Sequence, residues 1–323
     1  LTIFNCTIAD CYPYGAYIES YGDVYVANCT FTNNNRAGLG GFGEGAAEQA
    51  VLPSNGVQEI TPAGLWIRAY GSIRIEGCTF KDSRGTGLAL VKYPSTLGET
   101  SLGSASTSDL SYNVSVNFCF FKNNSEYHLW AVGGAVNASY NDWSCYTFDE
   151  IEGKIYHYFD HPSPYGGILN YSRVYFTPWL LANGSPMPVS AMEILAASNA
   201  SGANAEVSLP DGSTELYENL VAFTAAPISV YVNASYPIGL EAASYLCNPA
   251  GTALPAGFTA LPIFTEFAVG NFSALEEILL AIHYSDSDVE AAKVSEYTLT
   301  PFYFKDGEWH SFSTLSLIHI SEP

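Results

Sequence analysis

The sequence predicts an all-β protein in which a solenoid of stacked coils is followed by a second β domain. One segment is repeated: Tyr21 to Asn34 reads YGDVYVANCTFTNN, and Tyr70 to Ser83 reads YGSIRIEGCTFKDS. A third copy, NVSVNFCFFKNN, begins at Asn113, and the chain itself starts within a fourth. Apolar and polar residues alternate in each copy, which is typical of short strands with one buried face. Because one such repeat cannot bury its own apolar face, the coils are expected to stack.

Each coil is predicted to contain three short strands. Residues 24–26 form the first, and a polar corner at residues 27–28 separates it from the second at residues 29–31. A glycine lies seven residues after Ile8, Phe31 and Phe80, and we expect it to form a further corner with positive φ before the third strand. These three glycines are Gly15, Gly38 and Gly87; His128 breaks the series.

Four cysteines share one position of the repeat. Cys6, Cys29, Cys78 and Cys119 are expected to form an inward-facing ladder, with neighbouring strands about 4.8 Å apart. The sequence has 7 cysteines and no paired Cys-x-x-Cys motif. We therefore expect free thiols that fill the core as small apolar groups, and no disulfide framework.

These repeats resemble the right-handed parallel β-helix of the pectin-lyase-like superfamily, in particular the repeats of archaeal and bacterial surface proteins. The segment VNASYNDWS, from Val136 to Ser144, followed by DEIEGKIYHYFD and RVYFTPWL, is similar to the closing segment of such proteins. That segment usually reads Tyr-Asn-x-Trp-Gly, and here Ser144 takes the place of the glycine. The resemblance implies a single-stranded β-helix solenoid over residues 1–181. It leaves function open, because lyases, hydrolases, epimerases, adhesins and inert spacers share this fold.

Beyond the solenoid, residues 182–206 are rich in Ala, Ser, Asn and Gly and are predicted to form a linker. Residues 207–314 show alternating strands and a hairpin signal at Asp306-Gly307, which predicts a β-sandwich module. Residues 279–312 resemble accessory sandwich modules near the C-termini of archaeal surface proteins. The final LSLIHISEP, residues 315–323, resembles a translated sequencing adapter and is excluded from the fold prediction. The sequence is accordingly expected to be a fragment truncated at both ends.

Charge narrows the choice of partners. The net charge is -21, with 11 Lys and Arg, so nucleic acid and anionic membranes are not expected partners. A polyanionic polysaccharide is also disfavoured unless Ca²⁺ bridges the charges. No apolar run is long enough to cross a membrane, so membrane attachment is expected only through an anchor outside this fragment.

Asparagine predicts the location of the protein. The sequence has ten Asn-x-Ser/Thr triplets, more than its composition predicts. Asn5 and Asn28 belong to the coil repeat, and the other eight predict an extracellular, glycosylated surface protein. These eight are Asn113, Asn123, Asn137, Asn170, Asn183, Asn199, Asn233 and Asn271.

Two insertions interrupt the repeat, between Gly38 and Gly64 and between Leu90 and Val114. We expect both to leave from the same corner of the coil and to form a wall beside a groove that binds polysaccharide or cell-envelope glycan. The candidate groove residues are Glu44, Glu48, Glu59, Lys92, Tyr93, Glu99 and Asp109. The alternative is that the insertions are merely tolerated in surface loops. The first insertion also contains G-x-G-x-x-G at Gly38, but outside a βαβ unit this motif does not predict a nucleotide site.

The candidates for catalysis and for metal binding have less support in the sequence than the groove residues. Asp10, Asp82, Lys81 and Arg84 lie at related positions of successive coils and are the candidates for catalysis. His157 and His161 are spaced to share a metal on a helix, although the apolar stripe from Phe148 to Phe159 and the capping box at Thr147 favour a packing helix. Asp286 and Asp288 suit either a Ca²⁺ loop or a capped turn. No other cofactor is expected.

The sequence therefore predicts a structural, adhesive or glycan-contacting surface protein. The rival prediction is a polysaccharide lyase or glycoside hydrolase acting in a groove beside the two insertions. A lyase of this fold needs a Lys or Arg base beside acidic Ca²⁺ ligands, and a hydrolase needs carboxylates that face one bond.

Overall fold

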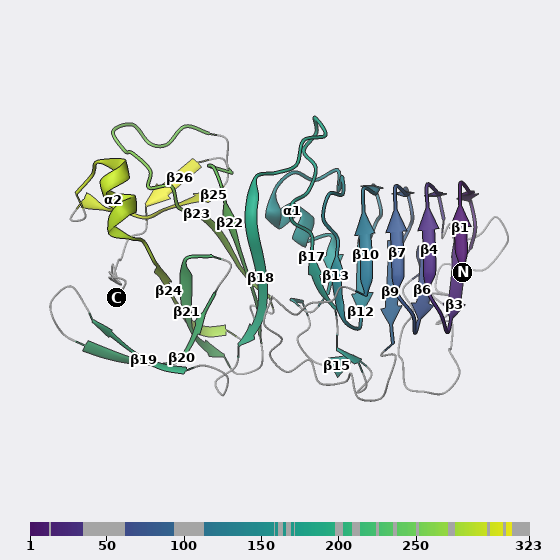
Figure 1. Ribbon diagram of the computed structural model, residues 1–323, viewed down its shortest axis with the longest axis horizontal. Coiled ribbons are helices and arrows are strands. Elements are labelled where there is room, and N and C mark those ends of the chain that lie inside the picture. Colours follow the sequence, from purple (N-terminus) through teal and green to yellow (C-terminus); the bar gives the residue numbers. More distant parts are fainter. Residues whose placement is uncertain are drawn as a thin grey trace. The chain divides into compact units, whose positions relative to one another are not determined.

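The computed structural model describes residues 1–12, 14–34, 62–93, 113–157, 159–160, 164–165, 169–170, 172–197, 203–208, 214–223, 226–234, 238–249, 252–270, 275–295, 298–305 and 308–311. The chain divides into two compact units, Leu1–Met187 and Pro188–Pro323. Each unit is described by itself (Figure 1).

The first unit is a parallel β-helix, as predicted, whose successive coils contribute strands to three parallel sheets of six, four and five strands. We name the sheets A, B and C. Sheet A consists of β1 (Thr2–Phe4), β4 (Val24–Ala27), β7 (Ile73–Glu76), β10 (Val114–Asn117), β13 (Ala135–Asn137) and β17 (Arg173–Tyr175). Sheet B consists of β2 (Thr7–Ala9), β5 (Thr30–Thr32), β8 (Thr79–Lys81) and β11 (Phe120–Lys122). Sheet C consists of β3 (Ala16–Ser20), β6 (Ala63–Ala69), β9 (Thr86–Lys92), β12 (Leu129–Val132) and β14 (Ile155–Tyr156).

The coils pair in register, so equivalent residues stack directly on one another inside the solenoid. In sheet B, Phe31 pairs with Phe80 and Phe80 with Phe121. Their rings stack with centroids 5.2 and 5.1 Å apart, and all three are fully buried. Stacked aromatic pairs stabilise a fold by more than the burial of their surface area alone. This column therefore helps to hold the coils in register.

The cysteines form the predicted ladder of free thiols. Cys29, Cys78 and Cys119 are buried, whereas Cys6 in the first coil is exposed. The amide of Cys6 donates to Sγ of Cys29, and the amide of Cys29 donates to Sγ of Cys78, both at 3.4 Å. The thiols of Cys29 and Cys78 thus accept a hydrogen bond from the coil beside them while they fill the core.

Buried asparagines, which the sequence analysis did not identify, join neighbouring coils. Oδ1 of Asn34 accepts from the amide of Cys11 at 3.1 Å, and its Nδ2 donates to the carbonyl of Ile8 at 3.1 Å. Asn124 makes the equivalent pair of bonds to Ser83 and Phe80 at 3.2 and 3.1 Å. Because each amide satisfies backbone groups of the previous coil, these side chains are buried without leaving polar atoms unpaired.

Positive φ occurs at two corners of each coil, and neither is the predicted glycine corner. One corner precedes sheet B and contains Asn5, Asn28 and Gly77. The other follows sheet B and contains Asp10, Asn33, Asp82 and Asn123, with φ between 53° and 57°. Asn, Asp and Gly are the residues that adopt this left-handed conformation most readily.

Glycine is required before sheet C for a reason other than the positive φ that we predicted. The residues that align there are Gly15, Gly64 and Gly87, so Gly64 takes the place expected of Gly38. A Cβ at Gly64 would lie 2.7 Å from the carbonyl oxygen of Gly87, and one at Gly87 would lie 2.6 Å from Nδ2 of Asn124. Close approach of the next coil, and not positive φ, therefore requires glycine here.

The predicted helix around His157 is shorter than expected. Helix α1 covers only Phe148–Glu152, begins with the predicted capping box of Thr147 and Glu150, and is capped at Gly153. Residues 155–156 pair with β12 as strand β14, because Ile155 continues the buried column of sheet C. Phe159 lies beyond this strand, so the proposed apolar stripe does not lie on one helix. Two further short strands, β15 (Pro164–Tyr165) and β16 (Leu169–Asn170), pair antiparallel.

The second unit contains antiparallel sheets and a hairpin. One sheet has the order β18 (Val189–Ala197), β22 (Ile238–Tyr245), β23 (Phe264–Val269). The other has the order β19 (Ala203–Ser208), β20 (Thr214–Ala222), β21 (Ile228–Ala234), β24 (Leu275–Ile282). Alternate residues of β21 and β22, including Ile228, Val230 and Leu240, share one buried cluster.

Strand β18 and part of β19 fall within the stretch predicted as a linker, because Met192 and Ile194 are buried. The predicted hairpin is present as β25 (Phe302–Lys305) paired with β26 (Glu308–Ser311). Helix α2 (Asp286–Ala292) begins with a capping box of Ser285 and Asp288. None of the helices in the described ranges is long and apolar enough to span a membrane.

The stacking of coils predicts a difference between two glycines in the same Tyr-Gly motif. A Cβ at Gly71 would lie 2.4 Å from the carbonyl carbon of Gly22, whereas a Cβ at Gly22 would meet nothing within 4 Å. We expect Gly71→Ala to lower the free energy of unfolding by about 2 kcal/mol through overpacking, and Gly22→Ala to change it by less than about 0.5 kcal/mol. Urea denaturation of both variants measures this, and equal effects would contradict the stacking explanation.

His128 makes the solenoid sensitive to acid. Burial, followed by the charge of Lys154, lowers the pKa of His128 from 6.5 to about 4, and its Nδ1 lies 3.2 Å from Nδ2 of Asn124. The neutral ring accepts this amide proton, so its stabilisation is complete above pH 6.5 and is lost as the pH falls towards 4. Relative to His128→Gln, the wild type should lose on the order of 3 kcal/mol between pH 7 and pH 4.

Urea denaturation of both proteins at several pH values gives this difference. Asp160, whose pKa burial raises to about 6, acts in the opposite direction and is common to both proteins. A wild-type minus variant difference that stays constant with pH would refute the role of His128.

Candidate functional site

The two insertions leave from different corners of the coil, which corrects the prediction that they share one. The first connects β5 to β6, and the second connects β9 to β10. They therefore flank opposite ends of the strands of sheet C. The reason is that residues 35–61 precede Gly64, so the glycine at the start of β6 lies after the first insertion and not before it.

The outer face of sheet C carries a group of aromatic and charged side chains around the buried Trp66, which packs in a cluster with Ala89 and Trp130. In-register pairing of β3 with β6 places Tyr17 opposite Trp66 and Glu19 opposite Arg68. The rings of Tyr17 and Trp66 stack with centroids 4.8 Å apart and an angle of 6° between their planes. We call the five residues Tyr17, Glu19, Trp66, Arg68 and Tyr93 the Arg68 site.

Arg68 is the electrostatic centre of this site. Its guanidinium lies 4.6 Å from the centroid of the Tyr93 ring, donates to the Tyr93 hydroxyl, and lies 3.9 Å from Oε1 of Glu19. Burial acts to lower the pKa of Arg68, but Tyr93 and Glu19 outweigh it and raise the pKa above its ordinary value. The guanidinium is therefore a fixed cation over an aromatic ring, a geometry that is worth more when partly removed from water.

Two hydrogen-bond donors of the Arg68 site have no acceptor among the residues that the structure describes. They are Nε1 of Trp66 and Nε of Arg68, and both atoms are buried. Trp66 itself is only 3% exposed, while Tyr17 beside it is 40% exposed. Since buried donors are nearly always paired in folded proteins, these two atoms are the unsatisfied polar groups of the Arg68 site.

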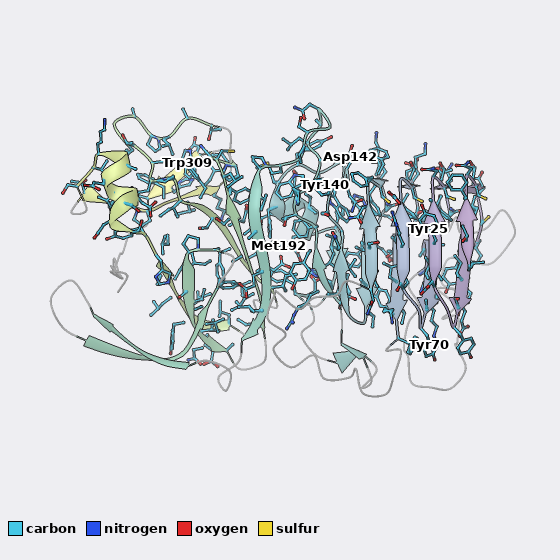
Figure 2. The ribbon with its side chains drawn as sticks, in the orientation of Figure 1. Tyr25, Tyr70, Tyr140, Asp142, Met192 and Trp309 are labelled. Carbon is cyan, nitrogen blue, oxygen red and sulfur yellow. The ribbon has the colours of Figure 1, made fainter. Side chains whose placement is uncertain are left out.

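The edge of the solenoid beside the Arg68 site is lined by stacked tyrosines. Tyr21 stacks on Tyr70 at 5.2 Å, and Tyr70 stacks on Tyr93 at 4.9 Å, so the row continues from the solvent-exposed Tyr21 to the Arg68 site. Figure 2 places Tyr70 at the edge where the strands of sheet A begin. The row extends the aromatic surface across three coils.

Among the predicted groove residues, Tyr93 belongs to the Arg68 site. Lys92 is buried, and its ammonium group donates to the carbonyl oxygens of Tyr70 and Tyr93, which fixes this corner of the chain. The remaining candidates lie outside the described residues: Glu44, Glu48, Glu59, Glu99 and Asp109.

The candidate catalytic residues lie at and near the corner after sheet B. Asp10 and Asp82 both have the positive φ required there, with Asn33 between them in the row. Two strand spacings separate these carboxylates by roughly 9.5 Å, beyond retaining geometry and at the far limit of inverting geometry. Nδ2 of Asn123 donates to Asp82 at 3.2 Å. Lys81 lies opposite Lys122 in the register of β8 and β11. Arg84 is exposed, and its amide donates to the carbonyl of Asn34. The row of Asp10, Asn33, Asp82 and Asn123 is therefore explained by the left-handed backbone conformation of this corner.

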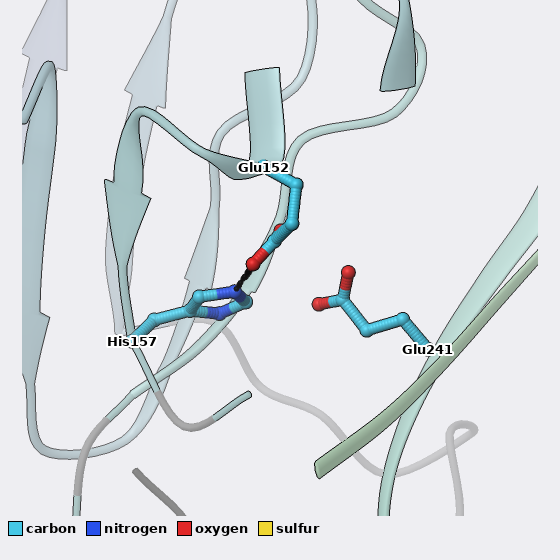
Figure 3. Close-up of side chains that lie close together, drawn as sticks. All are labelled: Glu152, His157 and Glu241. Atoms are coloured by element: carbon cyan, nitrogen blue, oxygen red, sulfur yellow. Dashed lines mark hydrogen bonds and ion pairs between the residues drawn. The ribbon is translucent and has the colours of Figure 1, made fainter. Parts of the chain in front are cut away.

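His157 is buried and hydrogen-bonded to the carboxylate of Glu152. Its Nε2 lies 2.9 Å from Oε1 of Glu152, as Figure 3 shows, and its Nδ1 accepts from the amide of Val174 at 3.2 Å. These partners assign the Nε2–H tautomer, which donates to Glu152. Burial lowers the pKa of His157, but the Glu152 carboxylate outweighs it and raises the pKa. His161 lies outside the described residues.

Asp288 caps helix α2, because its carboxylate accepts from the amide of Ser285 at 2.9 Å. This is the capped turn that the sequence analysis offered as the alternative to a Ca²⁺ loop. Asp286 is in the first turn of the same helix, where a carboxylate is favourable without a metal.

The predicted glycosylation asparagines fall in different surroundings. Asn113, Asn123 and Asn183 are exposed, and Asn123 also occupies a left-handed corner. Asn137 is half-buried and accepts from the hydroxyl of Ser139 at 2.7 Å, and Asn233 is half-buried in β21. The side chains of Asn170, Asn199 and Asn271 lie outside the described residues.

The sequence analysis missed the Arg68 site as a unit. The signal is the shared spacing of Tyr17-Ile-Glu19 and Trp66-Ile-Arg68, which puts an aromatic residue and a charged residue on the same outer face of adjacent strands. The long insertion between the two segments conceals their pairing.

Comparison with known families agrees with the geometry of the first unit. Residues 1–144 match the family described as "Right handed beta helix region". No curated protein matches the chain, and neither does any solved structure.

Proposed function

We propose that this protein is an extracellular surface protein whose β-helix contacts a neutral glycan at the Arg68 site without chemical turnover. The observation that carries the proposal is the pair of buried, unpaired donors of Trp66 and Arg68 beside the stacked Tyr17 and Trp66 rings. A sugar presents C–H groups to an aromatic face and hydroxyl oxygens to such donors. The tyrosine row of Tyr21, Tyr70 and Tyr93 would extend contact along a chain of sugars.

Charge supports a neutral ligand over an acidic polysaccharide. The net charge is -21, and the one cation of the Arg68 site is already beside Glu19. A uronate chain would therefore meet repulsion from the protein as a whole, unless Ca²⁺ bridges the charges.

A location at the cell surface rests on the excess of Asn-x-Ser/Thr triplets and on the resemblance to pectin-lyase-like surface proteins of archaea and bacteria. In this proposal the second unit is a β-sandwich accessory module, and residues 315–323 derive from a sequencing adapter. The rival hydrolase or lyase has less support, because the acids of the corner row are separated by amides.

The glycan proposal predicts that Arg68→Lys weakens binding about tenfold. Lysine keeps the charge but loses the planar fork that contacts Tyr93 and offers Nε–H to the ligand. Calorimetric titration with cellohexaose and chitohexaose measures binding, and polygalacturonate with and without Ca²⁺ is the acidic probe. The matched control is Arg74→Lys on β7, since Arg74 also contacts a tyrosine and a glutamate, at 5.4 and 2.7 Å.

Binding that is equal in the Arg68→Lys and Arg74→Lys variants would contradict the site. Tight binding of polygalacturonate alone would contradict the neutral ligand. Release of new reducing ends or of unsaturated products from any of these polysaccharides would support the enzyme instead.

The surface location predicts modification of Asn183 in a host that attaches N-glycans. Asn183 is exposed in a turn, where its Oδ1 accepts from the amide of Ser185 at 2.9 Å. Mass spectrometry of the secreted chain should find a glycan on the peptide containing Asn183, and Asn183→Gln should remove it while the peptide containing Asn113 is unaffected. An unmodified Asn183 in such a host would count against the surface location.

A further inference from the structure

We infer that Phe118 and Tyr140 form a second glycan-contacting site, on the opposite edge of the solenoid from the tyrosine row. Phe118 follows β10 and Tyr140 follows β13, so both lie where the strands of sheet A end. In Figure 2 Tyr140 lies at one edge of the solenoid and Tyr70 at the other. The inference shares its ligand class with the proposed function but does not depend on the Arg68 site.

The backbone at these two positions is unfavourable for aromatic residues. Phe118 has a φ of 56° and Tyr140 a φ of 59°. The same corner contains Asn5, Asn28 and Gly77 in the other coils, which adopt this conformation at little cost. A bulky side chain with positive φ is an outlier, and such outliers concentrate at functional positions.

Burial does not offset this backbone cost. Phe118 is 57% exposed and Tyr140 is 39% exposed. The rings stack with centroids 5.6 Å apart and an angle of 15° between their planes. Two stacked aromatic rings are thus exposed to solvent, at a corner where a smaller residue would fold more easily.

Neutral polar groups lie beside the ring pair. Nδ2 of Asn117 donates to Oδ1 of Asn137 at 3.3 Å and to the hydroxyl of Ser139 at 3.2 Å. The Ser139 hydroxyl in turn donates to Oδ1 of Asn137 at 2.7 Å. This connected network fixes the side chains next to the rings.

An exposed aromatic pair bordered by amides and hydroxyls fits a pyranose ring, which combines an apolar face with a rim of hydroxyl groups. A protein partner is less suitable, because a stable interface needs about 800 Å² on each side with an apolar centre larger than two rings. The net charge of -21 disfavours nucleic acid. A neutral glycan is therefore the ligand class that we assign.

Because the Arg68 site lies on sheet C, whereas Phe118 and Tyr140 lie at the corner between sheets A and B, one short oligosaccharide cannot occupy both. Two segments of a glycan network could be bound at once, and binding to a multivalent surface would then be tighter than either contact alone.

The test replaces both rings with the residue that the other coils use. Phe118→Asn together with Tyr140→Asn should leave the chain folded, with a melting temperature equal to or a few degrees above the wild type, because Asn suits positive φ. Titration with cellohexaose and chitohexaose should find two binding events per chain in the wild type and one in the double variant. The binding event that remains in this double variant should disappear when Tyr17→Ala and Arg68→Lys are added to it. Tyr12→Asn, which removes a 56% exposed aromatic residue outside both sites, is the control.

The possible failures are distinguishable. If the wild type binds one hexasaccharide per chain and the double variant binds it equally well, the inference falls and the Arg68 site stands. If the double variant loses several degrees of melting temperature, the rings serve folding and the inference also falls. If neither site binds any probe, the inference and the proposed function fall together.

Discussion

In-register pairing between coils is the constraint on which the rest of the first unit depends. A three-residue strand such as β5 has no hydrogen-bonding partner within its own coil, so its backbone is satisfied only by β2 and β8. This pairing repeats every contact at the spacing of neighbouring strands, about 4.8 Å. It is why Phe31, Phe80 and Phe121 stack as one column, and why buried asparagines reach the backbone of the previous coil. Glycine is needed wherever that spacing leaves no room for a Cβ.

The same constraint separates residues that the fold needs from residues that are free to act. At inward positions and at corners, the choice of residue is dictated by packing and by backbone conformation. The Asp and Asn residues after sheet B are there because they tolerate positive φ, which explains their shared position without catalysis. Outward positions of sheet C hold both a buried cluster around Trp66 and the charged residues of the Arg68 site. Phe118 and Tyr140 stand out because they place exposed aromatic side chains at a corner where the other coils have Asn or Gly.

The sites are also products of pairing between distant segments. Glu19 and Arg68 are far apart in the sequence, yet lie opposite each other on β3 and β6. A solenoid can thus build a site from one or two residues per coil, and substitutions in each coil can tune it without altering the core. The buried His157 and Glu152 pair shows the contrasting use of polar groups, since their hydrogen bond is internal to the fold.

The sequence by itself determined the repeat, the parallel β-helix, the ladder of free thiols and the capping box at Thr147. These features depend on local patterns and on the period of the coil, which are visible in one dimension. It did not determine where the insertions leave the coil, where α1 ends, or that Tyr17, Trp66 and Arg68 form one site. Those outcomes depend on which residues are brought opposite each other by pairing across insertions of unequal length. Only the tertiary structure decides that register, because the energy that selects it comes from contacts between coils.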